Sequence, residues 1–228
     1  MDRATLQPTS PSHPRRALST LALAVPLWFW SGRSSAGAQQ EEKLSDSVRT
    51  ALASAIADSR PPERSFVLPQ DRLAYADWLA EMSTRLLRKK PEYRARLDFL
   101  RTLDYEATRA GLDRQMVLGL IQVESNFRRY AISDAGARGY MQVMPFWTKA
   151  IGDGDTRKLF DMRTNLRYGC VILRHYLDIE SGNLFRALGR YNGSLGRPEY
   201  PNAVLAAWKT HWTYAPVKKP EEKAASKT

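Results

Sequence analysis

Glu124 is the residue whose sequence context best suits acid–base chemistry. Apolar residues precede it at helical spacing: Met116 and Leu120 lie eight and four positions earlier, with Ile121 beside them. A carboxyl that borders such a stripe is partly removed from water, which penalises its charged form and raises its pKa. Glu124 could therefore keep a proton near neutral pH and donate it to a leaving group, as a general acid does.

The same glutamate has a plainer interpretation. Arg128 follows it by four positions, so the two side chains could form an exposed helix ion pair that contributes about 0.3 kcal/mol. Pairs of this kind are common on helix surfaces. The residues that follow Glu124 favour the catalytic interpretation.

Three separate pieces of sequence follow in a fixed order. Ser125 comes directly after Glu124, and Tyr191-Asn192 lies further on, preceded by Arg190. Between them runs a segment rich in glycine, methionine and polar residues, with Ser133, Gly136, Ala137, Gly139, Met141, Gln142, Met144 and Pro145. Three such pieces in order are far more specific than any one of them.

From about Ala107 to Trp208 the chain resembles the lytic transglycosylase catalytic domain of the soluble transglycosylase family, within the goose-type lysozyme superfamily. That family has a catalytic Glu-Ser pair, a Ser-x-x-Gly-Ala-x-Gly-x-Met-Gln-x-Met-Pro run and an Ala-Tyr-Asn element. The resemblance covers nearly half of the chain and implies a mainly α-helical, lysozyme-like domain. It implies that Glu124 is catalytic and that the substrate is bound by Ser133, Gln142, Met144, Tyr191, Asn192 and Tyr200.

The chain departs from the family pattern at three places. Tyr140 stands where the family often has Leu, and Arg190 stands where it often has Ala. Tyr200-Pro201 stands where the family usually has Tyr-Val, although proline is acceptable at a first helical position. No reacting group is lost, but Tyr200 is a weaker match than Tyr191.

The substrate-binding residues also have structural interpretations. The resemblance implies that Ser133 hydrogen-bonds the catalytic carboxyl and the substrate, yet it could be an ordinary loop serine. Gln142 could read sugar hydroxyls or an N-acetyl group, or it could brace the loop as a buried amide. Met144 and Tyr191 could be core residues. The family context favours the binding roles.

The chain divides into four expected regions. Residues 1–38 are typical of a signal peptide, with Arg15-Arg16, an apolar stretch and a small-x-small pattern at Ala36-Gly37-Ala38. Residues 39–106 form an accessory helical segment, 107–215 the catalytic domain, and 216–228 a disordered tail rich in Lys, Glu, Ala and Pro. Ala17–Trp30 is shorter than the roughly 20 residues that a membrane helix needs. We therefore expect an exported, periplasmic protein without a stable membrane span after cleavage.

Periodicity predicts helices and little else. One is expected from Glu41 to Asp58, a second along the stripe through Leu79 and Leu86, and a third from Pro91 toward Ala110. Gly111 then breaks the pattern, and Asp113 is expected to cap the helix that carries Glu124. At most a small β-element is expected between Ala131 and Gln142. The accessory helices look more like scaffold than like a docking unit for a partner.

The formal net charge of +11 suits a polyanionic partner. Peptidoglycan fits, because its peptide stems and attached wall polymers carry carboxylates and phosphates; charge alone would equally fit nucleic acid. With the resemblance, we expect peptidoglycan glycan strands and no nucleic acid. His175 and His211 lack the clustered spacing of a zinc site, so we expect no metal and no cofactor. Cys170 is the only cysteine, which excludes an intramolecular disulfide, and its helical spacing predicts a buried thiol.

The resemblance implies cleavage of the β-1,4 bond between N-acetylmuramic acid and N-acetylglucosamine, with formation of 1,6-anhydro-muramic acid ends. Two alternatives stay open: a hydrolytic muramidase on the same fold, in which Asp134, Asp153 or Asp155 helps to position water, and a noncatalytic peptidoglycan-binding protein. The sequence does not choose among wall turnover, assembly of a secretion apparatus and antagonism, so secretion or cell-envelope machinery is a candidate partner. It also leaves open exo or endo cleavage, the Sec or twin-arginine route, and the oligomeric state.

Overall fold

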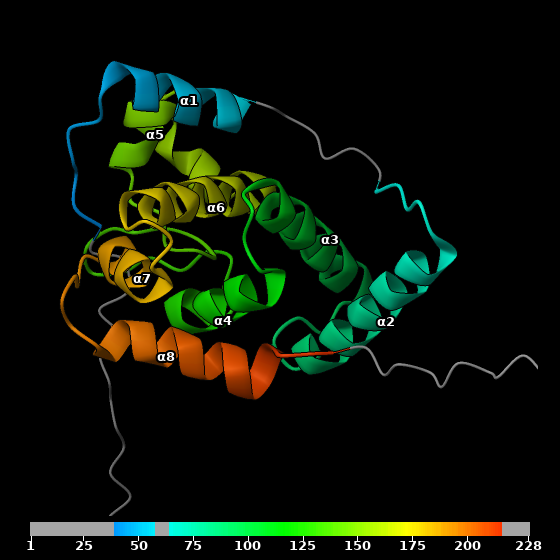
Figure 1. Ribbon diagram of the computed structural model, residues 1–228. Helices are drawn as coiled ribbons and strands as arrows, with labels where there is room; N and C mark the ends of the chain where they lie inside the picture. The colour runs from blue at the N-terminus through cyan, green and yellow to red at the C-terminus, as the bar shows by residue number, and fades with distance from the viewer. Residues whose placement is uncertain (1–38, 58–63, 216–228) are drawn as a thin grey trace, which may run out of the picture. The chain divides into compact units, whose positions relative to one another are not determined.

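The computed structural model describes residues 39–57 and 64–215, and this part of the chain is mainly helical (Figure 1). The helices are α1 (Asp46–Ala57), α2 (Pro69–Leu86), α3 (Tyr93–Arg109), α4 (Arg114–Ser125), α5 (Phe146–Ile151), α6 (Met162–Ile179), α7 (Leu184–Asn192) and α8 (Glu199–Ala207), with a short 3₁₀ helix η1 (Thr156–Phe160) and a π-helical turn η2 (Trp208–Trp212). The expected signal peptide and tail lie outside the described residues.

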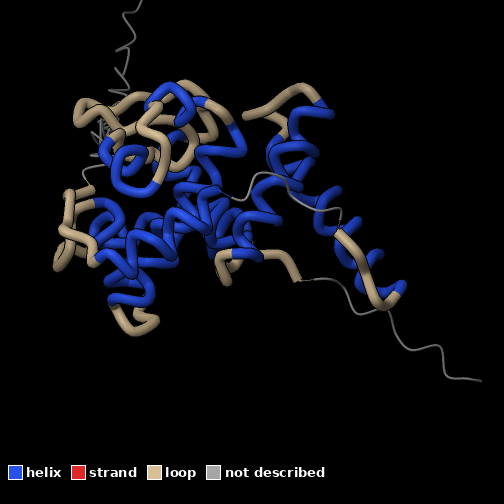
Figure 2. Tube along the Cα trace, turned by 90° about the horizontal axis from the view of Figure 1, so that it is seen from above, coloured by secondary structure: helices blue, strands red, loops and turns tan. Residues whose placement is uncertain are grey.

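The described residues contain no strand, as Figure 2 also shows. Two isolated antiparallel bridges link Arg138 to Ile132 and to Val143. They confirm the small β-element expected between Ala131 and Gln142, and they fold the segment between α4 and α5 back on itself. Its rigidity comes from these bridges and from side-chain hydrogen bonds, because no sheet supports it.

The helix that carries Glu124 begins and ends as its sequence predicts. Gly111 has a φ of +64°, a left-handed conformation that favours glycine, and separates α3 from α4. Asp113 caps α4 by accepting hydrogen bonds from the backbone N–H groups of Gln115 (2.6 Å) and Met116 (3.1 Å). Left-handed Asn126 ends the helix directly after Ser125. Both ends of α4 are therefore fixed, and Glu124 lies in its last turn.

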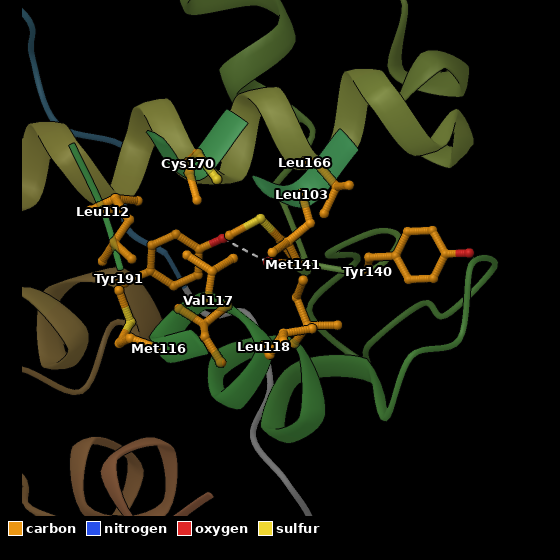
Figure 3. Packing of buried hydrophobic residues seen from close by; sticks show 14 of the residues in the cluster. Leu103, Leu112, Met116, Val117, Leu118, Tyr140, Met141, Leu166, Cys170 and Tyr191 are labelled. Atoms are coloured by element: carbon orange, nitrogen blue, oxygen red, sulfur yellow. Dashed lines mark hydrogen bonds between the residues drawn. The ribbon is translucent and has the colours of Figure 1, made fainter. Parts of the chain in front are cut away.

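The core surrounds α4. This helix packs against α8 and η2 on one side and against α3 on another, while α6 packs against α3 and α7. Three of the buried side chains, Val117, Leu118 and Met141, are shown in Figure 3 together with Cys170 of α6. Cys170 is fully buried, as its spacing predicted, and burial raises the pKa of its thiol.

The N-terminal helices share this core. Leu79, Met82 and Leu86 of α2 are buried and belong to the same hydrophobic cluster as the residues of α4. The expected domain boundary between residues 106 and 107 falls inside α3, because this helix runs without a break to Arg109. These contacts support a scaffolding role for α2 and α3.

The first described helix is shorter than expected. It begins at Asp46, whereas the sequence suggested a start near Glu41. The reason is a local cap: the Ser45 hydroxyl accepts a hydrogen bond from the Val48 N–H (3.4 Å), and Asp46 places a negative charge in the first turn. Before this cap, Glu42 forms an ion pair with Arg190 of α7 (2.7 Å). The segment ahead of α1 is thus tied to α7 and is not free to continue the helix.

Among the described residues, no helix has the length and apolar character that crossing a bilayer requires.

Candidate active site

The Glu124 carboxyl is buried in the structure. The residue is 4% exposed, and burial raises the pKa of its carboxyl to about 8. Arg128 does not pair with it; the Arg128 Nε instead donates to the Ser125 carbonyl oxygen at 3.1 Å. The exposed ion pair is therefore wrong as an interpretation, and a proton-carrying carboxyl at neutral pH is the consequence of the burial.

Among the described residues, Tyr200 is the side chain that hydrogen-bonds to this carboxyl. Its hydroxyl donates to Glu124 Oε1 at 2.5 Å, and this hydrogen bond lowers the pKa of Glu124 against the larger effect of burial. The other oxygen, Oε2, is buried and has no hydrogen-bond partner in the described part of the chain. One carboxyl oxygen is thus held by the protein, and the second is left to interact with a ligand.

The close approach of two helices brings Tyr200 to Glu124. A Cβ atom added to Gly119 of α4 would lie 2.8 Å from the backbone nitrogen of Trp208, so only glycine lets α4 approach the end of α8 this closely. Tyr200 lies in the first turn of α8, with Pro201 behind it. The sequence ranked Tyr191 above Tyr200 as a site residue, yet Tyr200 is the tyrosine that contacts Glu124.

Tyr191 holds the loop that faces Glu124. Its hydroxyl donates to the carbonyl oxygen of Met141 at 2.7 Å, the dashed line in Figure 3. Its ring is fully buried and packs edge-on against Tyr176 at 6.5 Å. Burial and then the Glu124 charge raise the pKa of Tyr191. The Tyr191 hydroxyl therefore donates its hydrogen bond to the Met141 backbone and not to Glu124.

Gln142 and Ser133 brace the segment between α4 and α5. The buried Gln142 amide donates to the carbonyl oxygens of Ala131 (3.2 Å) and Gly139 (3.0 Å). The Ser133 hydroxyl accepts from the Ala137 N–H (3.0 Å), and the structure gives it no hydrogen bond to Glu124. In this unliganded geometry both residues have the loop-bracing roles that the sequence left open as alternatives.

Asn165 of α6 organises the same segment and was not singled out from the sequence. Its amide nitrogen donates to the carbonyl oxygens of Arg138 and Leu159, both at 2.8 Å, and its Oδ1 accepts from the Met141 N–H at 2.8 Å. A Cβ on Gly139 would collide with this amide at 2.3 Å. The signal in the sequence is a polar residue directly before Leu166, beside the apolar stripe that continues to Cys170. The structure shows that this residue is fully buried.

Ser125 joins the end of α4 to this segment. Its buried hydroxyl donates to the Tyr140 carbonyl oxygen at 2.7 Å. Because Ser125 is the neighbour of Glu124 and Tyr140 the neighbour of Met141, the bond fixes the distance between the acid and the loop. The Glu-Ser pair thus has a structural reason: glutamate carries the proton, and serine anchors the turn that follows.

Met144 lies beside a residue that the sequence placed at the mature N-terminus. The Met144 N–H (3.2 Å) and the Trp147 indole N–H (3.1 Å) both donate to the Gln39 side-chain oxygen. Gln39 is 4% exposed. Its side-chain oxygen therefore satisfies the N–H groups of Met144 and Trp147, and Met144 is an expected substrate-binding residue.

Asn192 ends α7 close to Tyr191. Its amide nitrogen donates to the Ser194 hydroxyl at 3.1 Å, whereas its buried Oδ1 has no hydrogen-bond partner among the described residues. Gly193 follows with a φ of +72° and reverses the chain. Like Glu124 Oε2, the Asn192 oxygen is a buried polar atom that the described residues leave without a partner.

The segment that carries Glu124 is similar to known proteins. A family model described as the transglycosylase SLT domain matches residues 101–203. Membrane-bound lytic murein transglycosylase C of Haemophilus influenzae (strain PittEE) is 33% identical over 130 residues, which cover 50% of this chain and 36% of the relative. The transglycosylase of Enterobacteria phage PRD1 is 30% identical over 116 residues, covering 48% of this chain and 42% of the relative. The chain thus spans less than half the length of these relatives. The match confirms the resemblance seen in the motifs and the mainly α-helical, lysozyme-like fold.

Proposed function

Because residues 101–203 match the family model of the transglycosylase SLT domain, we propose that the protein is a peptidoglycan lytic transglycosylase. Its substrate is the glycan strand, and the bond cleaved is the β-1,4 link between N-acetylmuramic acid and N-acetylglucosamine. The observation that carries the proposal is the buried Glu124 carboxyl, whose pKa is raised to about 8 and whose Oε2 has no partner among the described residues.

In the first step Glu124 acts as a general acid. Its proton passes to the glycosidic oxygen, the bond from that oxygen to the muramic acid anomeric carbon breaks, and the N-acetylglucosamine end leaves as an alcohol. The positive charge left at the anomeric carbon is stabilised by the substrate's own 2-acetamido oxygen. Tyr200 donates a hydrogen bond to the carboxylate that forms and so stabilises the charge that the step places on Glu124.

In the second step the Glu124 carboxylate acts as a base. It removes the proton from the C6 hydroxyl of the muramic acid, and that oxygen bonds to the anomeric carbon to close a 1,6-anhydro ring. The glutamate regains the proton that it gave away, and no water is consumed. One acid is enough for this cycle, whereas most glycoside hydrolases use two carboxylates.

Of the three aspartates that could have supported a hydrolase, Asp134 is exposed, and the other two are engaged in ion pairs. Asp153 forms an ion pair with Lys158, and Asp155 forms one with Arg157 at 3.0 Å; both aspartates are on the surface. These hydrogen bonds lower the pKa of both carboxyls. The ion-pair partners of both lie on the same surface segment and not at Glu124, which supports the single-carboxylate cycle over the muramidase alternative.

The remaining site residues bind the sugar in this proposal. Gln142 and Ser133 shape the floor of the site through the loop, and Tyr191 holds that loop at Met141. The free Asn192 Oδ1 accepts a hydrogen bond from a sugar hydroxyl or amide. The Met144 side chain, which is partly buried, offers an apolar surface to a sugar ring.

The products of digestion test the proposal. Purified sacculi are incubated with the protein, and the released muropeptides are measured by mass spectrometry. We expect 1,6-anhydro-muramic acid ends. Reducing ends, heavier by one water, would establish the hydrolytic muramidase. Release of nothing, under conditions in which a control enzyme works, would favour a noncatalytic peptidoglycan-binding protein.

The setting of the activity is the cell envelope. We propose export through the signal peptide of residues 1–38 and action in the periplasm, since peptidoglycan lies outside the cytoplasm. The excess of basic residues suits the acidic wall. Secretion or envelope machinery remains a proposed partner, and the sequence does not indicate which surface would contact it.

A further inference from the structure

A groove between α2 and α3 lies outside the candidate active site. It has a cavity volume of about 1070 Å³, and its walls come from the segment before α2, from α2 and α3 themselves, and from the start of α6. Such a volume reaches the upper end of the range for pockets that hold drug-sized ligands. We infer that this arginine groove, defined by Arg72, Arg101 and Arg163, binds the acidic stem peptide of peptidoglycan.

The three arginines that define the groove have no ion-pair partner in the described part of the chain. They come from three different helices, α2, α3 and α6, and all three are exposed. Their neighbours in the groove differ: Arg64 pairs with Asp104, and Arg109 pairs with Glu106. Unpaired guanidinium groups that line one cavity are suited to carboxylates, which they bind through two parallel hydrogen bonds.

The walls between the arginines are apolar and aromatic. Leu79 is buried, and Tyr75 packs against Phe66 in a tilted arrangement with 5.3 Å between ring centroids. Tyr105 lies on the α3 side. A ligand for this groove therefore combines negative charges with short aliphatic parts, which a chain of phosphates alone does not offer.

One acidic side chain adds selectivity. Asp98 of α3 lines the groove and has no ion pair with a described residue. Its carboxylate repels a ligand that carries negative charge only, and it attracts an ammonium group. Wall stem peptides combine these features, because they carry several carboxylates, alanine methyl groups and, at their diamino acid, an amine. The choice of this ligand rests on the proposed function.

Titration with a free stem peptide tests the groove without any bond cleavage. The probe is the synthetic tetrapeptide L-Ala–γ-D-Glu–meso-diaminopimelate–D-Ala, added to the purified full chain and followed by calorimetry. We expect Arg101→Gln and Arg72→Gln each to weaken binding about tenfold, as loss of a charge-assisted hydrogen bond does. Arg101→Lys keeps the charge but loses the planar fork, so it should weaken binding less than Arg101→Gln.

Arg88→Gln is the matched control, since Arg88 is an exposed arginine that does not line the groove; it should bind the peptide like the unchanged protein. The same peptide with its carboxylates amidated should bind at least tenfold more weakly. Equal weakening by Arg88→Gln and Arg101→Gln would overturn the inference, because it would mean general charge attraction. Tighter binding of the protein to vesicles of anionic phospholipid than to the peptide would also overturn the inference. Either result leaves the digestion products, and thus the proposed function, untouched.

Discussion

The Tyr200 hydroxyl donates a 2.5 Å hydrogen bond to Oε1 of Glu124, from a position 76 residues further along the chain. This bond lowers the pKa of a carboxyl that burial has raised to about 8. Tyr200 therefore opposes the larger effect of burial on the pH range over which Glu124 carries a proton.

Tyr200→Phe should shift the pH profile as well as the rate. Without the hydrogen bond the carboxylate loses its stabilisation, so the pKa of Glu124 rises further. An acid-catalysed rate falls as pH exceeds this pKa, and the variant's alkaline limb should therefore move to higher pH. Release of muropeptides measured from pH 5 to 10 checks this. A lower rate with an unmoved limb would mean that Tyr200 only packs.

Glu124→Gln removes the proton carrier and keeps the shape. The amide neither donates nor reclaims the proton, so turnover should fall by at least roughly 10² to 10⁴ fold, while the fold and binding to sacculi are kept. Turnover is measured by release of soluble muropeptides. Gln115→Ala, in the first turn of α4, is the control variant on the same helix. A Glu124→Gln protein close to full activity would remove Glu124 from the mechanism.

The parts of the fold that depend on neighbouring residues were predictable, and those that depend on distant ones were not. Gly111 and Asp113 bracket α4 through local turn and cap chemistry, so the helix could be predicted correctly. Asn165 bonds to three backbone groups that lie 6 to 27 residues away, across two loops. No periodicity records such contacts. The acid was visible from its own stripe, whereas Tyr200 was named only through the family resemblance and without its contact to the acid.

Gln39 shows the same limit for the N-terminal segment. The sequence marked it only as the residue after a cleavage pattern, whereas the structure has its side chain accept hydrogen bonds from Met144 and Trp147. A single glutamine in a polar stretch carries no sign of such a contact. Its partners lie 105 and 108 residues away, where only the folded arrangement of α5 brings them together.

Stability should decrease with pH because of the same carboxyl. Glu124 has a folded pKa of about 8 against 4.5 for an ordinary glutamate carboxyl, so the folded state holds a proton that the unfolded state has lost between these two values. The stabilisation is complete below about pH 4.5 and disappears as pH rises through 8, by roughly 1.4 kcal/mol per pH unit. In urea unfolding at pH 5, 6.5 and 8, the free energy of unfolding of Glu124→Gln should therefore increase relative to that of the unchanged protein as the pH rises. Parallel curves for the two proteins would mean an ordinary carboxyl pKa.

Export should produce a protein that begins at Gln39. The pattern Ala36-Gly37-Ala38 is a cleavage site of the small-x-small type, and Ala17–Trp30 is too short to remain as a membrane span. N-terminal sequencing of the extracytoplasmic pool checks both points. An intact Met1 in the membrane pellet would instead indicate an uncleaved anchor and would restrict the enzyme to wall near the membrane.

Gly119→Ala should disturb the pairing of Glu124 with Tyr200 from a distance. In an isolated helix this change is stabilising by about 1 kcal/mol, but here the new Cβ would lie 2.8 Å from the backbone nitrogen of Trp208 and 3.0 Å from its Cα. Backbone atoms do not rotate away as a flexible side chain does, so α4 and α8 must separate. Overpacking of this kind costs roughly 1–3 kcal/mol, so after the helix gain we expect a net loss of stability of up to about 2 kcal/mol.

Activity should fall further than stability in this variant, because a shift of about 1 Å in a reacting group costs about 10² fold in rate. Gly189→Ala in α7 is the matched control: its Cβ would be 3.3 Å from Leu195, a contact that a small movement of the loop relieves. Both variants are compared by thermal unfolding and by muropeptide release. A Gly119→Ala protein with the stability and rate of Gly189→Ala would show that the close approach of α4 to Trp208 does not position Tyr200 on the catalytic carboxyl.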